Sequence, residues 1–129
     1  MAIVVRSDLK MSPGLLSAQV LHAGMEFIRQ KAIIQSEEEA RTDRALKFEA
    51  VEEMWIMSPY VSVLSVGTRE ELEHIRKQAK DAGLKTHEWI DIIPSPVIPG
   101  FTPKCMVGIS IGPHDADDIK RVCGALPLY

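Results

Sequence analysis

The sequence is short of cysteine, with two in 129 residues, and it has no long hydrophobic run. Cys105 and Cys123 cannot form a zinc site with each other, and we expect them to be buried thiols in a reducing compartment. No apolar run approaches the roughly 18 to 20 residues that a membrane-spanning helix needs, and no basic leader with a cleavage site precedes the first strand. We therefore expect a cytoplasmic protein without a membrane span.

Several common motifs are also missing. The sequence contains no GxGxxG, GxxxxGK[ST], GxSxG, HExxH or CxxC, which leaves dinucleotide, Walker-type, elbow-serine and common zinc sites without support. The net charge of -3 argues against non-specific nucleic-acid binding, because such binding depends on clustered Lys and Arg that displace counterions. Residues 69–85 hold enough Lys and Arg for a local basic patch, whereas residues 37–53 hold most of the glutamate excess.

What is present is the composition of one globular domain. With 46% hydrophobic and 26% charged residues, no segment is apolar-poor enough to be called disordered. A chain of this length can bury one hydrophobic core but is too short for two domains. We therefore treat residues 1–129 as a single domain.

Hydrophobic periodicity predicts the element order β-α-α-β-α-β-β-α. The strands are predicted at "AIVV", "YVSVLSVG", "LKTHEWID" and "KCMVGISIG", and the helices over about 15–31, 36–54, the residues after Thr68, and 115–123. In the last strand, the alternating Cys105, Val107, Ile109 and Ile111 are expected to share a face. The pattern is typical of an α/β domain with a four-stranded mixed sheet flanked by helices on both faces.

Helix-end signals support these boundaries. Ser36 would open the second helix, in which Glu37 to Arg41 and Asp43 to Lys47 are spaced as i,i+4 pairs. Thr68 and Glu71 would form a capping box for the third helix, which has Leu72, Ile75 and Ala79 on one stripe. Gly83 is a natural end for that helix.

The first predicted helix has two different faces. Its apolar residues Leu16, Val20, Ala23 and Phe27 recur at spacings of three and four and should pack on the sheet. The opposite arc holds Gln19, His22, Glu26, Arg29 and Gln30, with Leu15 in its middle. Such an arc is more often a solvated face with one stray leucine. The alternative is a cleft wall, with Leu15, Gln19 and His22 along one stripe.

Other candidate residues follow predicted strands, where sites of open α/β sheets tend to lie. Lys10 precedes the first helix, whose free N–H groups can receive an anion such as a phosphate, although a loop lysine is more often a plain surface residue. Asp91 and Ser95 could orient a water or hold a substrate hydroxyl, but near prolines such residues usually form turns. Trp55 and Trp89 offer stacking surfaces, with a core or interface role as the default.

A family resemblance emerges from pieces that occur in order along the chain: "VVRSDLKM", "AQVLHA", Trp55, "AGLKTHEWID", "IPG" and "ISIGPHDADDIKRVCGALPLY". Together they resemble the type 2 peptidyl-tRNA hydrolase family over nearly everything except residues 31–54 and 101–106. The resemblance implies a homodimer with a four-stranded mixed sheet flanked by helices. It also implies an enzyme that cleaves the ester joining a peptide to the terminal ribose of tRNA, without a metal or organic cofactor.

The resemblance also implies site residues. Gln19 and His22 match the family's glutamine and histidine, Asp91 matches its aspartate, and Ser95 stands where the family has a threonine. For substrate binding, Lys10 matches the lysine of the DLKM segment, and Thr102 is the nearest counterpart of a further threonine. Lys10 or Lys104 would supply a positive charge that this chain otherwise lacks.

This positive charge is missing because Leu15 stands where the family has a lysine thought to take part in catalysis. "PSP" at 94–96 replaces an Arg-Thr-Gln-like run, and the segment 31–54 is longer than in typical members. Three hypotheses follow. The chain is a divergent peptidyl-tRNA hydrolase in which Asp91 and Ser95 arrange the water or ribose; a binding module for a small molecule, peptide or protein; or a hydrolase of another small ester or amide.

Overall fold

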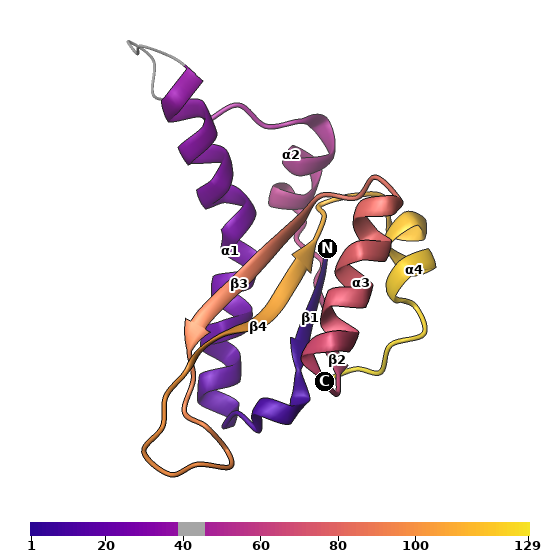
Figure 1. Ribbon diagram of the computed structural model, residues 1–129. Coiled ribbons are helices and arrows are strands. Elements are labelled where there is room, and N and C mark those ends of the chain that lie inside the picture. The colour runs from indigo at the N-terminus through magenta and orange to yellow at the C-terminus, as the bar shows by residue number, and fades with distance from the viewer. Residues whose placement is uncertain (39–45) are drawn as a thin grey trace.

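The computed structural model describes residues 1–38 and 46–129 of the chain (Figure 1). The elements follow the predicted order, with one added 3-10 turn. They are β1 (Ala2–Arg6), η1 (Ser7–Leu9), α1 (Pro13–Glu38), α2 (Ala50–Met57), β2 (Ser62–Val66), α3 (Arg69–Asp81), β3 (Thr86–Ile92), β4 (Lys104–Ile111) and α4 (Ala116–Cys123). In the described residues, no helix has the length and apolar character that crossing a membrane requires.

The four strands form one mixed sheet in the order β2-β1-β4-β3. β1 and β2 are parallel, and β4 is antiparallel to both β1 and β3. The carboxyl ends of β1, β2 and β3 therefore lie at the same edge of the sheet, beside the amino end of β4. The η1 turn and the loop of residues 93–103 lie at this edge, at the bottom of Figure 1. We call it the carboxyl edge.

Helices cover both faces of the sheet, as predicted (Figure 1). On one face, Ala23 and Phe27 of α1 pack with Ile3, Val5 and Val107. On the other face, α3 and α4 complete a second core, which includes the predicted stripe of Leu72, Ile75 and Ala79. Cys105 packs on the first core and Cys123 lies in the second, and both are free thiols. Burial raises the pKa of the Cys123 thiol to about 11.

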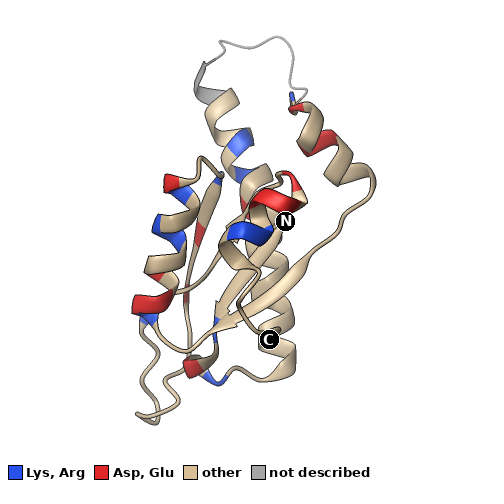
Figure 2. Ribbon diagram, turned by 90° about the vertical axis from the view of Figure 1, so that its right-hand side faces the viewer, with Lys and Arg blue, Asp and Glu red and all other residues tan. Residues whose placement is uncertain are grey.

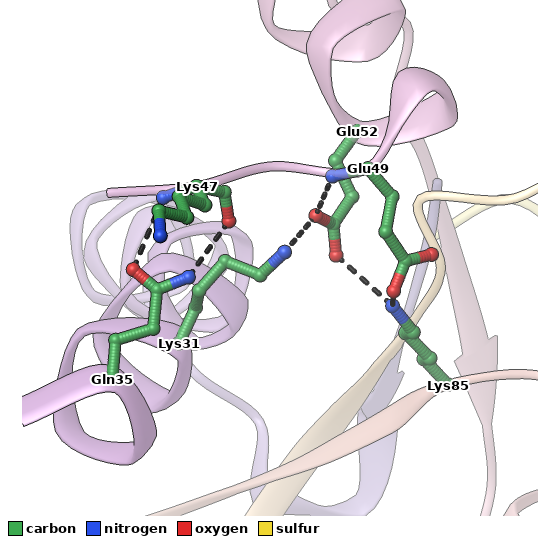
Figure 3. Close-up of polar contacts among 6 residues, drawn as sticks. All are labelled: Lys31, Gln35, Lys47, Glu49, Glu52 and Lys85. Carbon is green, nitrogen blue, oxygen red and sulfur yellow. Dashed lines mark hydrogen bonds and ion pairs between the residues drawn. The ribbon is translucent and has the colours of Figure 1, made fainter. Parts of the chain in front are cut away.

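The helix predicted over 36–54 is wrong in its boundaries. Ser36 lies inside α1, because residues 32–36 contain no glycine or proline to end the helix. α2 begins only at Ala50, where Glu49 and Glu52 form a reciprocal capping box. Gln35 of α1 donates to and accepts from the Lys47 backbone at 2.8 and 3.0 Å (Figure 3). The predicted pairs Glu37–Arg41 and Asp43–Lys47 lie outside the described residues.

The signals for the ends of α3 are confirmed with one shift. Thr68 Oγ1 accepts the N–H of Glu71 at 3.1 Å, as expected for the N-cap. The Glu71 carboxylate accepts the N–H of Gly67 at 2.6 Å, so the return bond reaches one residue further than a capping box requires. Gly83 follows the helix with a φ of 75°, a left-handed conformation that favours glycine.

The single face predicted for β4 is wrong. Cys105 and Val107 face α1, whereas Ile109 and Ile111 face α3 and α4. The reason is a β-bulge: Trp89 pairs with Gly108 and Ile90 with Met106, so Val107 is an extra residue in β4. One extra residue moves all later side chains to the opposite face.

Candidate functional site

The second turn of α1 meets the end of β3 in a chain of polar contacts. Gln19 is 3% exposed and lies between Trp89 and Asp91. Its Oε1 accepts the indole N–H of Trp89, and its Nε2 donates to Asp91 Oδ2 at 2.8 Å. Trp89 and Asp91 are two residues apart on a strand, so they point to the same face. This face is the one that α1 covers.

The Asp91 carboxylate is held in its charged form. Its pKa is lowered first by the hydrogen bond from Gln19 and then by the backbone N–H of Ile92, which donates to Oδ1 at 2.7 Å. Partial burial opposes this effect, and the nearby charge of His22 adds to it. In the part of the chain that the structure describes, no lysine or arginine side chain hydrogen-bonds to Asp91. The hydrogen bonds to this carboxylate thus come from neutral N–H groups.

His22 and Leu15 continue the stripe on α1. The His22 ring is exposed and lies 4.8 Å from the Trp89 ring, centroid to centroid, at 45°. Leu15 is half-buried and packs on the core beneath α1. Leu15, Gln19 and His22 thus lie on one stripe of α1, and Gln19 joins this stripe to Asp91.

The solvated-face interpretation of the polar arc is wrong for two of its residues. Gln19 and Glu26 are each 3% exposed, because the arc faces β3 instead of solvent at these positions. Arg29 and Gln30 donate to the Glu26 carboxylate at 2.5 and 2.7 Å. Burial would raise the pKa of Glu26, but these hydrogen bonds outweigh it and the net shift is downward.

Ser95 is engaged in a turn of its own loop. Its Oγ accepts the backbone N–H groups of Val97 and Ile98 at 3.2 and 3.0 Å, and its own N–H donates to Phe101 at 2.7 Å. Among the described residues, no hydrogen bond joins Ser95 to Asp91. The Ser95 O–H proton stays available for donation, because the turn uses the oxygen only as an acceptor. Thr102 is exposed in the same loop.

Lys10 and Lys104 lie at the carboxyl edge with Asp91. Lys10 follows η1 in a left-handed conformation, with a φ of 47°, and its N–H donates to Ser7. Lys104 opens β4 and pairs with Ile92, the residue after Asp91. Both side chains are exposed, and neither has a carboxylate partner among the described residues. They are therefore available for phosphates.

The basic residues of 69–85 do not form such a patch. Arg76 pairs with Glu73 at 3.0 Å and Lys77 with Asp81 at 2.6 Å. Lys85 is bound by Glu49 and Glu52. Figure 2 shows both signs of charge interspersed along α3. This surface is close to neutral, because most of its cations have acidic partners.

Trp89 is the site residue that sequence reasoning missed, since we assigned it a core role. The signal was its spacing: two residues before Asp91 on a strand, it had to share the face of that carboxylate. Its partner Gln19, 70 positions away, is not predictable from spacing.

A cavity elsewhere on the surface does not coincide with this site. A cavity of about 620 Å³ lies between the ends of β1 and β2 and the start of α3, and its walls include Ser7, Gly67 and His74. Neither Gln19 nor Asp91 lines it, so we locate the site by its polar contacts. Among the described residues, no three His, Cys, Asp or Glu side chains gather as a metal site would require.

Comparisons with known proteins identify relatives along the full chain. The family model described as "Peptidyl-tRNA hydrolase PTH2" matches residues 1–129. A peptidyl-tRNA hydrolase of Methanopyrus kandleri is 35% identical over 128 residues, covering 98% of this chain and 94% of the relative. Those of Methanothermobacter thermautotrophicus and Sulfolobus acidocaldarius are 31% and 32% identical; the alignments cover 98% and 99% of this chain and 96% and 98% of the relatives. The chain belongs to the peptidyl-tRNA hydrolase PTH2 family.

Proposed function

We propose that this protein hydrolyses the ester bond between a peptide and the terminal ribose of tRNA, with Asp91 at the centre of the site. The observation that carries the proposal is the buried Gln19 amide, which holds an ionised Asp91 at the carboxyl edge of the sheet. Family membership supplies the substrate class. The described site gives no specific support to a binding module or to a hydrolase of small esters.

The geometry suits Asp91 for orienting the attacking group. Each carboxylate oxygen accepts one N–H in the protein and has a further lone pair for a water or a ribose hydroxyl. A carboxylate with a lowered pKa is a weak proton acceptor but a good hydrogen-bond acceptor. Asp91 would therefore fix the water or ribose. The water attacks the ester carbonyl, the C–O bond breaks, and the ribose oxygen leaves with a proton.

The remaining residues of the site have supporting roles in this proposal. Gln19 and His22 would line the site beside Asp91. The Ser95 O–H would donate to a substrate oxygen, and Thr102 offers a second hydroxyl on the same loop. Lys10 and Lys104 would bind phosphates of the tRNA end. Because Leu15 cannot stabilise a developing oxyanion, we expect a rate about 10²- to 10³-fold below that of a site with a lysine there.

Peptide release from a peptidyl-tRNA tests the proposal. The wild-type protein should release peptide faster than a blank without enzyme, and Asp91→Asn should reduce this rate by about 10²-fold or more. The matched control is Asp81→Asn, which removes a carboxylate at the far end of α3 and should leave the rate unchanged. A wild-type rate equal to the blank would overturn the proposal.

We further propose that the protein acts in the cytoplasm as a homodimer. The support is family resemblance, together with apolar side chains exposed on α2 and near the end of β3, such as Met57 and Ile92. Sedimentation velocity at micromolar concentration should give a dimer, and a monomer would contradict this assembly.

A further inference from the structure

Trp89 contacts two candidate site residues and has no role in the function proposed so far. We propose that Trp89 is a positioning residue, which sets the orientation of the Gln19 amide and thereby the hydrogen bond that Asp91 receives. This inference rests on the proposed function of Asp91 and deepens it.

The direction of the indole bond determines the amide orientation. A buried amide needs partners for both its oxygen and its nitrogen, and Gln19 is 3% exposed. The indole N–H of Trp89 can only donate, so the atom that faces it must be Oε1. The NH₂ group of Gln19 then points the other way, to Asp91 Oδ2.

A flipped amide would lose both bonds. The oxygen and nitrogen of an amide are nearly the same size, so shape does not prevent the flip and only the partners decide. After a flip, the NH₂ group would face the indole N–H, and Oε1 would face the carboxylate. Asp91 also opposes the flip, but in the proposed reaction its oxygens must bind the water or ribose as well. Trp89 holds Gln19 without taking part in the reaction.

Trp89 is itself fixed in place. It packs on the core beneath α1, and the His22 ring lies 4.8 Å away. The residue opposite on β4 is Gly108, which has no side chain to compete for space on this face. The bulge in β4 lies next to this Trp89–Gly108 pair, from which the indole reaches Gln19.

The variant Trp89→Phe tests the inference, because it keeps an aromatic ring but removes the N–H. Carboxyl NMR titration should show the proton affinity of Asp91 rising about three- to tenfold. In peptide release, kcat should fall about tenfold while KM changes less than about twofold. The acid limb of the pH profile should move to higher pH, because Asp91 must be ionised.

Trp55→Phe is the matched control. The Trp55 indole N–H donates to the Tyr60 carbonyl at 2.9 Å, so this variant removes the same group without affecting Gln19. The Asp91 titration should stay at its wild-type position. If Trp89→Phe also leaves the titration there, the inference is overturned.

A second measurement applies even if Trp89→Phe does not fold. In Gln19→Ala, the indole N–H of Trp89 loses its acceptor, so its hydrogen exchange with water should become faster than in the wild type. Unchanged exchange would overturn the inference. Neither NMR measurement needs substrate. If the two variants show the expected NMR changes but the wild-type protein releases no peptide, the proposed function alone is contradicted.

Discussion

At the residue scale, the replacement of a cation by Leu15 is the largest departure from the family resemblance. Leu15 shares its stripe with Gln19 and His22 and is half-buried on the core beneath α1. Asp91 has hydrogen bonds from two neutral N–H groups instead of a charged partner. A cation at position 15 would therefore add a kind of interaction that the described site lacks.

We predict that Leu15→Lys raises kcat/KM for peptide release by about 10²-fold or more. The four-carbon stem of lysine can cover the same apolar surface while its amine reaches solvent, and an added oxyanion stabiliser has an effect of this order or larger. Release assays on both proteins measure the change.

The control for this prediction is Leu21→Lys. Leu21 is 64% exposed on the same helix but points away from the stripe. The Leu21→Lys variant adds the same charge without placing it beside Asp91, so its kcat/KM should rise little. Equal gains from both variants would mean that bulk charge, and not the site, limits the rate.

Helical projection predicted this stripe correctly, but it could not predict burial. Gln19 and Glu26 look like solvent-facing residues in a helix read alone. Gln19 is buried because Trp89 and Asp91 are partners about 70 positions later in the chain. From the sequence, Ser95 could be a turn former or a residue that binds substrate. The structure shows that its hydroxyl oxygen forms a turn, and the O–H proton remains free to donate.

At the element scale, an ion-pair network centred on the buried Glu52 attaches α2 to the rest of the fold (Figure 3). Glu52 is 2% exposed and accepts from Lys31 of α1, from the Glu49 N–H and from Lys85 before β3. Burial would raise the pKa of Glu52, but these donors outweigh it and lower the pKa. The network connects three segments that are distant in the sequence.

We predict that Glu52→Gln lowers the free energy of unfolding by about 3 kcal/mol, because it removes the buried carboxylate that pairs with the half-buried Lys31. The measurement is urea denaturation at neutral pH. Glu53→Gln, an exposed neighbour on α2, should cost less than about 0.5 kcal/mol. Similar losses in both variants would contradict a special role for the network.

The stabilisation that Glu52 provides should depend on pH, and the sign of this dependence follows from the direction of its pKa shift. Because the folded pKa of Glu52 lies below its unfolded value, its contribution is present above the unfolded pKa. It is lost as the pH falls through the folded pKa. The stability difference between wild type and Glu52→Gln should therefore shrink in acid. A difference that does not change with pH would contradict this linkage.

The bulge in β4 explains why strand alternation failed there. Gly108 was the available signal, because glycine inside a strand often marks a bulge or a close backbone approach. A Cβ at Gly108 would lie 2.7 Å from the Val4 carbonyl oxygen. Element order and types follow from local periodicity, whereas a register shift depends on the neighbouring strands, which a single segment does not reveal.

We predict that Gly108→Ala destabilises the protein by about 2 kcal/mol or more, since the backbone of β1 must move to accept the methyl group. Thermal or urea unfolding measures this. Gly14→Ala is the control, because an added Cβ there meets nothing within 4 Å and alanine favours the helix by up to about 1 kcal/mol. A neutral Gly108→Ala would contradict the close approach.

At the scale of the whole molecule, the charge distribution limits how tRNA can bind. The net charge is -3, and the cations of α3 mostly have acidic partners along the helix (Figure 2). The loop of residues 93–103 carries no charge. Lys10 and Lys104 are exposed at the carboxyl edge, where Asp91 also lies. Binding should therefore depend on few phosphate contacts, made near the scissile ester.

We predict a shallow salt dependence of tRNA binding. Two contacts to a single-stranded end give a slope of log K against log[salt] of about -1.4, because each neutralised phosphate contributes about -0.7. Lys10→Gln and Lys104→Gln should each reduce the slope by about 0.7. Lys80→Gln should not, because Lys80 lies in the last turn of α3, at the opposite end of the sheet. Fluorescence anisotropy across a salt series measures all four proteins. A slope of about -4 or steeper would show that tRNA uses a wider surface than the carboxyl edge.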